Sequence, residues 1–166
     1  MKDINIFCFG FGQVAKNFIK KLNTEQYNIN LSATSRSESS KKIFNGINYN
    51  SYLFNSEKFD QNLVIKNFSK FIESSKVKWL TYLSATSIYG DHKGEWVNEN
   101  SKTNPISNNG IARLKAENAW VSLEKDNKIP IQIFRLSGIY SNEKNILIRL
   151  KSGGVKLINK KKSLFF

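Results

Sequence analysis

Residues 4–15 read Ile4-Asn5-Ile6-Phe7-Cys8-Phe9-Gly10-Phe11-Gly12-Gln13-Val14-Ala15. The first half of this run is apolar and β-prone, and it ends at two closely spaced glycines. Beyond the glycines, apolar residues recur with a helical period and share one face: Val14, Ala15, Phe18, Ile19 and Leu22. A second β-prone run follows at residues 29–34. The order strand, glycine turn, helix, strand predicts a βαβ unit with two parallel strands.

The glycine turn has the spacing Gly10-x-Gly12-x-x-Ala15. In a dinucleotide-binding turn the first glycine permits the tight bend and the second lets the backbone approach the pyrophosphate, while a small third residue allows close helix–strand packing. The free N–H groups at the helix start then face the anion. We therefore expect a dinucleotide to be bound by the consecutive residues Gly10, Phe11, Gly12, Gln13, Val14 and Ala15. The alternative is an ordinary turn that needs glycine for its geometry alone.

The end of the second strand distinguishes between cofactors. An NAD site usually places an acidic residue there to bind the ribose hydroxyls. This chain instead has Ser35 and Arg36, with no acid before Glu38. A guanidinium can make a charge-assisted, bidentate contact with a 2′-phosphate. The segment therefore favours NADP, with NAD as the second choice, against the alternative that Arg36 is a solvated loop residue.

The remaining chain continues as an α/β pattern. We predict strands near 47–54, 77–83 and 131–136, and helices near 60–75, 110–125 and 145–151. A complete doubly wound sheet needs one more strand before residue 77. Either Leu63-Val64-Ile65 forms it in shortened form, or one strand–helix unit is missing, and we favour the loss. The predicted fold is a single Rossmann-like domain over 1–166, a doubly wound parallel sheet lacking that unit.

Length, charge and cysteine content narrow the class further. A chain of 166 residues with 40% hydrophobic content fits one domain. Neither a membrane-spanning run nor a leader segment is expected, and the single cysteine, Cys8, suits the cytoplasm as a buried residue. The net charge of +13 comes from scattered lysines, and only Lys160-Lys161-Lys162 form a block. The scattered lysines make a nucleic-acid binder the third and least favoured hypothesis, and the oligomeric state stays open.

Several separated motifs carry a resemblance to a known family. The segment 82–91, Tyr-Leu-Ser-Ala-Thr-Ser-Ile-Tyr-Gly-Asp, resembles the strand-end motif of extended short-chain dehydrogenases/reductases, the NAD-dependent epimerase/dehydratase group. Residues 130–140 resemble the strand that flanks the nicotinamide in that group, which implies a cofactor contact for Ser137. The runs 90–99, 110–113 and 116–120 are similar to an atypical, YeeZ-like branch. The resemblance implies an oxidoreductase or epimerase that acts on a small hydroxylated or sugar-like substrate.

The chain departs from the family at the residues that carry its chemistry. The family's Tyr-x-x-x-Lys pair matches Asn109 and Arg113, and an asparagine has no titratable proton to donate. The polarising Ser/Thr matches Ala85, whose neighbours Ser84 and Thr86 are the candidate substitutes. Tyr89 is a candidate surrogate acid and Arg113 a candidate grip on ribose or phosphate. The candidate catalytic set is therefore Ser84, Thr86, Tyr89 and Arg113, with Ser84 also a candidate cofactor contact.

The alternatives to catalysis remain open at this point. The only histidine, His92, lies in a polar segment with Asp91 and Glu95, and we expect it to be solvated and to hold no metal. The family would continue beyond residue 166 into a substrate-binding region, so we expect a C-terminally shortened chain. Asn109 and Ala85 favour a second hypothesis, a dinucleotide-binding module or degenerate remnant that does not catalyse.

Overall fold

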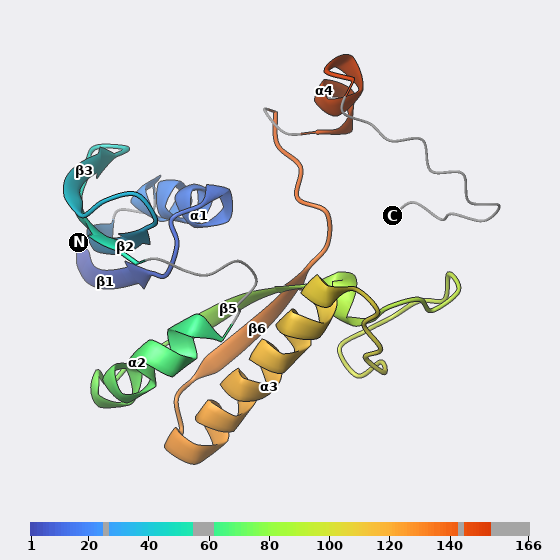
Figure 1. Cartoon of the computed structure of the whole chain (residues 1–166). Helices are drawn as coiled ribbons and strands as arrows, with labels where there is room; N and C mark the ends of the chain where they lie inside the picture. The colour runs from blue at the N-terminus through green and yellow to red at the C-terminus, as the bar shows by residue number, and fades with distance from the viewer. Residues whose placement is uncertain (25–26, 55–61, 143–144, 154–166) are drawn as a thin grey trace. The chain divides into compact units, whose positions relative to one another are not determined.

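The chain is described from a computed structural model, which covers residues 1–24, 27–54, 62–142 and 145–153 (Figure 1). It divides into two compact units, Met1–Val64 and Ile65–Phe166, and each is described by itself. The expectation of a single domain over 1–166 stays a prediction.

The first unit is a four-stranded sheet with one helix. Its elements are β1 (Lys2–Cys8), α1 (Gln13–Thr24), β2 (Tyr27–Ser35), β3 (Ser40–Phe44) and β4 (Ile47–Leu53). The strand order is β1-β2-β4-β3, with β1, β2 and β4 parallel and β3 antiparallel to β4. The predicted strand, glycine turn, helix and parallel strand are confirmed.

The register of β1 and β2 explains how this sheet buries one face. Ile4 lies opposite Ile29, and Ile6 lies opposite Leu31. Together with Ile19 of α1, these side chains form the core of the unit, where Ile19 and Leu31 are fully buried. Burying a side chain of this size contributes about 1.5–3 kcal/mol, so the α1 face holds the sheet and positions the turn between β1 and α1.

No strand was predicted between residues 35 and 46, and the structure corrects this with β3. Residues 40–44 form a hairpin with β4 through Asn45 and Gly46, which have φ values of 51° and 79°. An Asn-Gly pair between two strands is a strong hairpin signal because both residues tolerate the left-handed backbone. That dipeptide was the available signal for β3 in the sequence.

The second unit contains a strand–helix–strand crossover. Its elements are α2 (Leu63–Ser74, of which the first two residues fall in the first unit), β5 (Leu80–Ala85), the 3-10 turn η1 (Thr86–Ile88), α3 (Asn108–Asn127), β6 (Ile131–Leu136) and α4 (Ile146–Lys151). β5 and β6 are parallel, from Leu80 opposite Ile131 to Ala85 opposite Leu136. The helix α3 connects the two strands and packs on them, as a parallel pair requires.

Two predictions in this region need correction. Leu63, Val64 and Ile65 are the first residues of α2, so they are not a shortened strand. Among the described residues between β4 and β5, only α2 is formed, in keeping with the loss of a strand–helix unit. The strand predicted at 77–83 begins at Leu80 instead, since Val77, Lys78 and Trp79 precede the first backbone bond to the segment before β6.

The segment between η1 and α3 is fixed by close backbone approaches. Gly90 has a φ of 75°, and a Cβ there would collide with the carbonyl group of Asn104. A Cβ on Gly110 would lie 2.6 Å from the Ser87 carbonyl oxygen. Glycine is required at both positions because backbone approaches backbone without a side chain between them.

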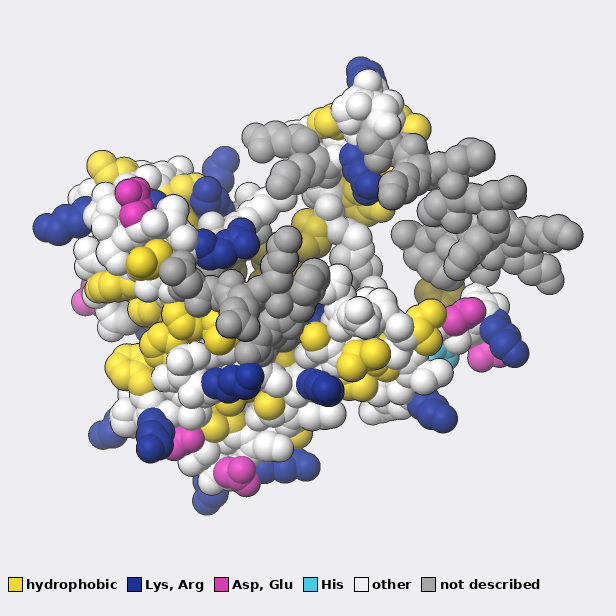
Figure 2. All heavy atoms as spheres, in the orientation of Figure 1, with side chains coloured by type: hydrophobic (Ala, Val, Ile, Leu, Met, Phe, Trp, Pro, Cys, Tyr) yellow, Lys and Arg dark blue, Asp and Glu magenta, His cyan; other side chains and the backbone are white. Residues whose placement is uncertain are grey.

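No helix in the part of the chain that the structure describes is long and apolar enough to cross a membrane. Lys and Arg side chains are dispersed over the face shown in Figure 2, with Asp and Glu among them.

Candidate functional site

The turn between β1 and α1 is built from backbone groups. Gly10 has a φ of 86°, a conformation that L side chains rarely adopt. Its N–H donates to the Thr34 hydroxyl oxygen at 2.8 Å, and Thr34 is itself buried in β2. One hydrogen bond thus ties the turn to the end of the neighbouring parallel strand and fixes its shape.

Open space surrounds the two glycines of this turn. A Cβ built on Gly10 or Gly12 meets no atom within 4 Å. The first helical bond of α1 joins the Lys16 N–H to the Gly12 carbonyl oxygen at 2.9 Å, so the N–H groups of residues 13–15 have no partner within the helix. The first turn of α1 also contains no acidic residue. Free N–H donors, the positive helix end and an approachable backbone together suit an anion such as a diphosphate.

Phe11 differs from its neighbours in the turn because its side chain belongs to the core. Its ring centroid lies 5.3 Å from that of Phe44 and 5.2 Å from that of Tyr49. Lys16 Nζ lies 6.0 Å from the Phe11 ring centroid. The Phe11 side chain therefore anchors the turn to the β3–β4 hairpin. Only the backbone of Phe11 faces the turn itself.

The end of β2 places two predicted cofactor residues side by side. The Ser35 hydroxyl lies 3.0 Å from the Ser37 hydroxyl and accepts from the Ser37 N–H at 3.3 Å. The Ser35 carbonyl oxygen accepts from the Phe54 N–H at 2.8 Å, which holds the strand end. Arg36, between the two serines, is exposed. The serines form a local turn, and the guanidinium is accessible to a ligand.

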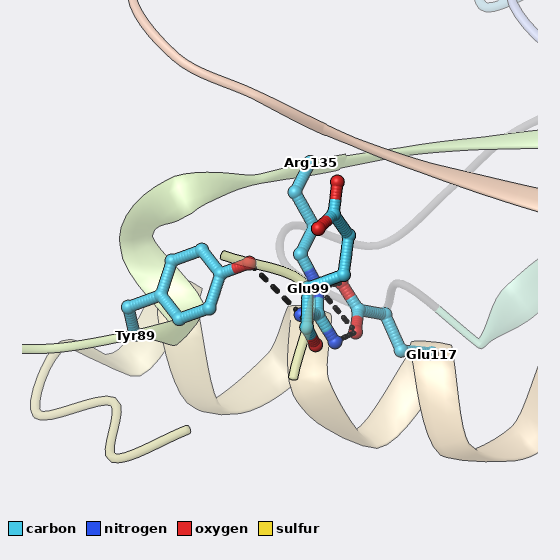
Figure 3. A network of polar contacts seen from close by, with 4 residues as sticks. All are labelled: Tyr89, Glu99, Glu117 and Arg135. Carbon is cyan, nitrogen blue, oxygen red and sulfur yellow. Dashed lines mark hydrogen bonds and ion pairs between the residues drawn. The ribbon is translucent and has the colours of Figure 1, made fainter. Parts of the chain in front are cut away.

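In the second unit, the main polar feature is a network around Arg135 of β6 (Figure 3). Arg135 Nη2 donates to Glu117 Oε2 at 2.9 Å, and Nε donates to both carboxylate oxygens at 3.2 and 3.3 Å. Arg135 Nη1 donates to the Tyr89 hydroxyl oxygen and to the Glu99 carbonyl oxygen, both at 3.0 Å. A single guanidinium therefore joins β6, α3, the residue after η1 and the loop that follows.

This network is strongly buried on the helix side. Glu117 is only 3% exposed and Tyr89 only 6%. The hydrogen bonds to Glu117, opposed by partial burial, raise the pKa of Arg135 above its ordinary value. No role was predicted for Arg135 or Glu117 from the sequence. The available signal was Arg135, a charged residue inside a predicted strand. A charged side chain is stable in a core only when it is paired.

Near the carboxyl end of β5 lie Ser84 and the backbone carbonyl that Arg113 contacts. Ser84 is 2% exposed, and its hydroxyl has no hydrogen-bond partner among the described residues. Arg113 of α3 donates from Nη1 to the Leu83 carbonyl oxygen at 3.2 Å. Burial raises the pKa of the nearby Tyr82, and the positive charge of Arg113 counteracts part of that rise. The end of β5 therefore holds the buried Ser84 hydroxyl next in sequence to the Leu83 carbonyl, which binds the Arg113 guanidinium.

The other candidate residues of the second unit are placed differently. Thr86 is exposed in η1, and Ser137 is exposed just after β6. Tyr89 is buried, with its hydroxyl accepting from Arg135. Asn109 is exposed in the first turn of α3, whose N-cap Ser107 accepts from the Gly110 N–H at 3.1 Å. The network and the strand end are therefore separate groupings, with Tyr89 in the network.

His92 lies 3.0 Å through Nε2 from the Lys102 carbonyl oxygen. Within the described residues, no group of three His, Cys, Asp or Glu side chains could hold a metal ion.

The second unit also contains a cavity of about 390 Å³. Its lining combines the loop after η1 with β6: Thr86, Tyr89, Val97, Asn98, Glu99, Ile133, Phe134, Arg135 and Leu136.

No protein-family model and no curated protein matches the chain. Solved structures do. A functionally unknown conserved protein from Silicibacter pomeroyi is 24% identical with a TM-score of 0.63, over 82% of this chain and 54% of that one. UDP-glucuronic acid 4-epimerase from Bacillus cereus, in complex with NAD, is 15% identical with a TM-score of 0.63, over 82% and 57%. UDP-N-acetylglucosamine 4-epimerase from Methanobrevibacter ruminantium, in complex with UDP-N-acetylmuramic acid, is 13% identical with a TM-score of 0.61, over 81% and 55%.

These similarities show the fold. It is a Rossmann-like α/β fold with mostly parallel strands, which the UDP-glucuronic acid 4-epimerase from Bacillus cereus shares. The chain spans slightly more than half the length of the structures that it matches.

Proposed function

We propose that the chain binds a nicotinamide dinucleotide at the turn between β1 and α1, with its diphosphate on the N–H groups at the start of α1. The observation that carries this proposal is the open space at Gly10 and Gly12, beside helix donors that have no helical partner. Dinucleotide-binding turns need this combination because the pyrophosphate approaches the backbone itself. The epimerase from Bacillus cereus, which shares the fold, was crystallised with NAD.

We propose further that the cofactor is NADP. Arg36 is exposed at the end of β2, where an NAD-selective site would carry an acid. Its guanidinium would pair with the 2′-phosphate, and the Ser35–Ser37 turn would supply hydroxyl groups beside it. NAD lacks the phosphate, so Arg36 contributes to the binding of only one of the two cofactors.

The experiment is a titration of the protein with NADPH and with NADH, repeated with Arg36→Ala. We expect saturable binding, with NADPH preferred by about tenfold or more, since one charge-assisted pair contributes roughly 1.5–3 kcal/mol. Arg36→Ala should remove the preference and leave NADH affinity nearly unchanged. Lys41→Ala, an exposed cation on β3, is the matched control and should change neither affinity. Equal losses for both cofactors in Arg36→Ala would contradict the NADP assignment.

For the chemistry, we propose an oxidoreductase or epimerase of the extended short-chain dehydrogenase/reductase type, acting on a small hydroxylated or sugar-like substrate. Arg113 would provide a permanent positive charge near the end of β5, where it already anchors on the Leu83 carbonyl oxygen. Such a charge stabilises a developing oxyanion without exchanging a proton. Ser84 and Thr86 would supply the hydroxyl groups for orientation.

A second candidate function is supported by Asn109 and Ala85, which stand where the family has its acid and its polarising hydroxyl. A chain without these groups would bind the dinucleotide and not catalyse. The two candidates differ in turnover: net NADPH oxidation with a panel of sugar-like ketones would report a reductase, and interconversion of sugar epimers without net cofactor consumption would report an epimerase. Cofactor binding without turnover, unchanged in Arg113→Ala, would favour the binding module.

A further inference from the structure

The loop between β2 and β3 holds an acidic residue in a fixed position. The Phe54 N–H donates to the Ser35 carbonyl oxygen at 2.8 Å, at the start of the loop. The Leu53 N–H donates to the Ser39 hydroxyl oxygen at 2.7 Å, at the end of the loop. Glu38 lies between these two anchors. Its backbone is therefore held beside the end of β2.

A carboxylate at this place opposes the proposed cofactor. In NAD sites an acid near the end of the second strand accepts hydrogen bonds from the ribose hydroxyls. A 2′-phosphate that pairs with Arg36 meets the charge of Glu38 two positions further along the same loop. Like charges placed close together weaken binding unless a cation neutralises one of them. The loop thus carries one group suited to NADP and one suited to NAD.

Lys42 of β3 supplies the neutralising cation. Its Nζ lies 3.8 Å from Glu38 Oε1, with the lysine side chain 33% exposed and the glutamate side chain 66% exposed. Lys42 lies opposite Tyr49 of β4, whose side chain packs against the core on the α1 side of the sheet. Successive residues of a strand point to opposite faces, so the exposed Lys41 lies on the other face. The register of β3 therefore assigns the pairing to Lys42.

We propose that Lys42 determines the cofactor specificity of this site by pairing with Glu38. This inference rests on the proposed dinucleotide function and deepens it. Lys42 acts through Glu38 and makes no contact with the phosphate itself, so it is a positioning residue. With the ammonium removed, the free carboxylate repels a 2′-phosphate and becomes available to a ribose 2′-hydroxyl. The pair therefore allows Arg36 to select NADP in a loop that also carries an acid.

The test uses adenosine 2′,5′-bisphosphate and 5′-AMP, which differ only in the 2′-phosphate and need no nicotinamide pocket. Each is titrated calorimetrically into the full chain and into Lys42→Gln. We expect Lys42→Gln to bind the bisphosphate about threefold to fivefold more weakly, an effect of the size found for exposed charge pairs. Its affinity for 5′-AMP should not fall. The loss should shrink in about 0.5 M KCl, because salt screens exposed charges.

Three further variants separate the charge of Lys42 from its packing. Lys42→Arg keeps the cation and should bind the bisphosphate as the unchanged protein does. Lys41→Gln removes a cation from the other face of β3 and is the matched control, with no expected change for either probe. The double variant Glu38→Gln/Lys42→Gln removes both charges together. It should return to the bisphosphate affinity of the unchanged protein, because no unpaired carboxylate remains.

Three results would overturn the proposal. Unchanged bisphosphate affinity in Lys42→Gln would show that the pair does not affect the 2′-phosphate. A loss that persists in the double variant would show that Lys42 acts on the phosphate directly. Equal losses of bisphosphate and 5′-AMP in Lys42→Gln would show a structural role. Failure of the proposed function looks different, since the unchanged protein would then bind neither probe, and this inference would fall with it.

Discussion

The two compact units use their polar groups in opposite ways. In the first, the turn between β1 and α1 leaves backbone N–H groups without helical partners, and a single hydrogen bond from Gly10 to Thr34 fixes its shape. In the second, Arg135 directs its guanidinium to Glu117, Tyr89 and Glu99. In the first unit the N–H groups at the start of α1 are available to a ligand. In the second unit the Arg135 guanidinium makes its hydrogen bonds within the protein.

The difference separates the proposed binding turn of the first unit from the structural network of the second. A guanidinium saturated by a buried carboxylate has little left for an anion, while helix-end amides gain a partner only when a ligand arrives. Substitutions in the second unit should consequently change stability before binding, and those in the glycine turn should change binding before stability.

The largest expected effect is on the stability of the second unit in Arg135→Leu. This change leaves the Glu117 carboxylate buried without its partner, which costs about 3–5 kcal/mol. Urea unfolding followed by tryptophan fluorescence measures it, since Trp79, Trp96 and Trp120 all lie in this unit. Lys115→Ala, on the exposed side of α3, should cost under about 0.5 kcal/mol. A similar loss in both variants would contradict a structural role for the pair.

The next effect concerns Cys8 in the first unit. Burial raises its pKa from 9.0 to about 11, so at pH 8 the folded protein holds about a hundredfold less thiolate than the unfolded chain. Alkylation by iodoacetamide at pH 8 should be slower by a similar factor in the folded protein than in urea. Because the folded state keeps its proton while the unfolded state loses it, the stability of this unit should fall as pH rises from about 9 to 11. Equal alkylation rates would show that β1 exposes the thiol.

The smallest effect is expected on the face of the first sheet away from the core cluster. Asn30 Nδ2 donates to Asn5 Oδ1 at 3.0 Å, and both residues are exposed. Water replaces such a bond, so Asn30→Ala should lower the free energy of unfolding by about 0.5 kcal/mol. Amide exchange of the buried Leu31 measures the change. A loss several times larger would mean that this face is covered in the folded protein.

The sequence was sufficient for features that depend on local pattern. The glycine turn, both strands around it and the boundaries of β6 are readable because spacing and periodicity determine them. The β3–β4 hairpin was readable in principle from Asn45-Gly46 and was missed because its strand is rich in lysine. The Arg135–Glu117 pair could not be predicted from the sequence, because it joins residues 18 positions apart through the packing of α3 on β6. The buried position of the Tyr89 hydroxyl depends on that same packing.

The most direct measurement of the central claim is NADPH binding by Gly12→Val, compared with the unchanged protein. A side chain at Gly12 meets no protein atom within 4 Å, so the fold should tolerate it at a cost of at most about 1 kcal/mol. Asn17→Val, on the exposed side of α1, controls for a β-branched residue in that helix. We predict that Gly12→Val loses at least tenfold in NADPH affinity while Asn17→Val binds normally. Equal affinity in both variants, with the protein folded, would contradict a dinucleotide site at this turn.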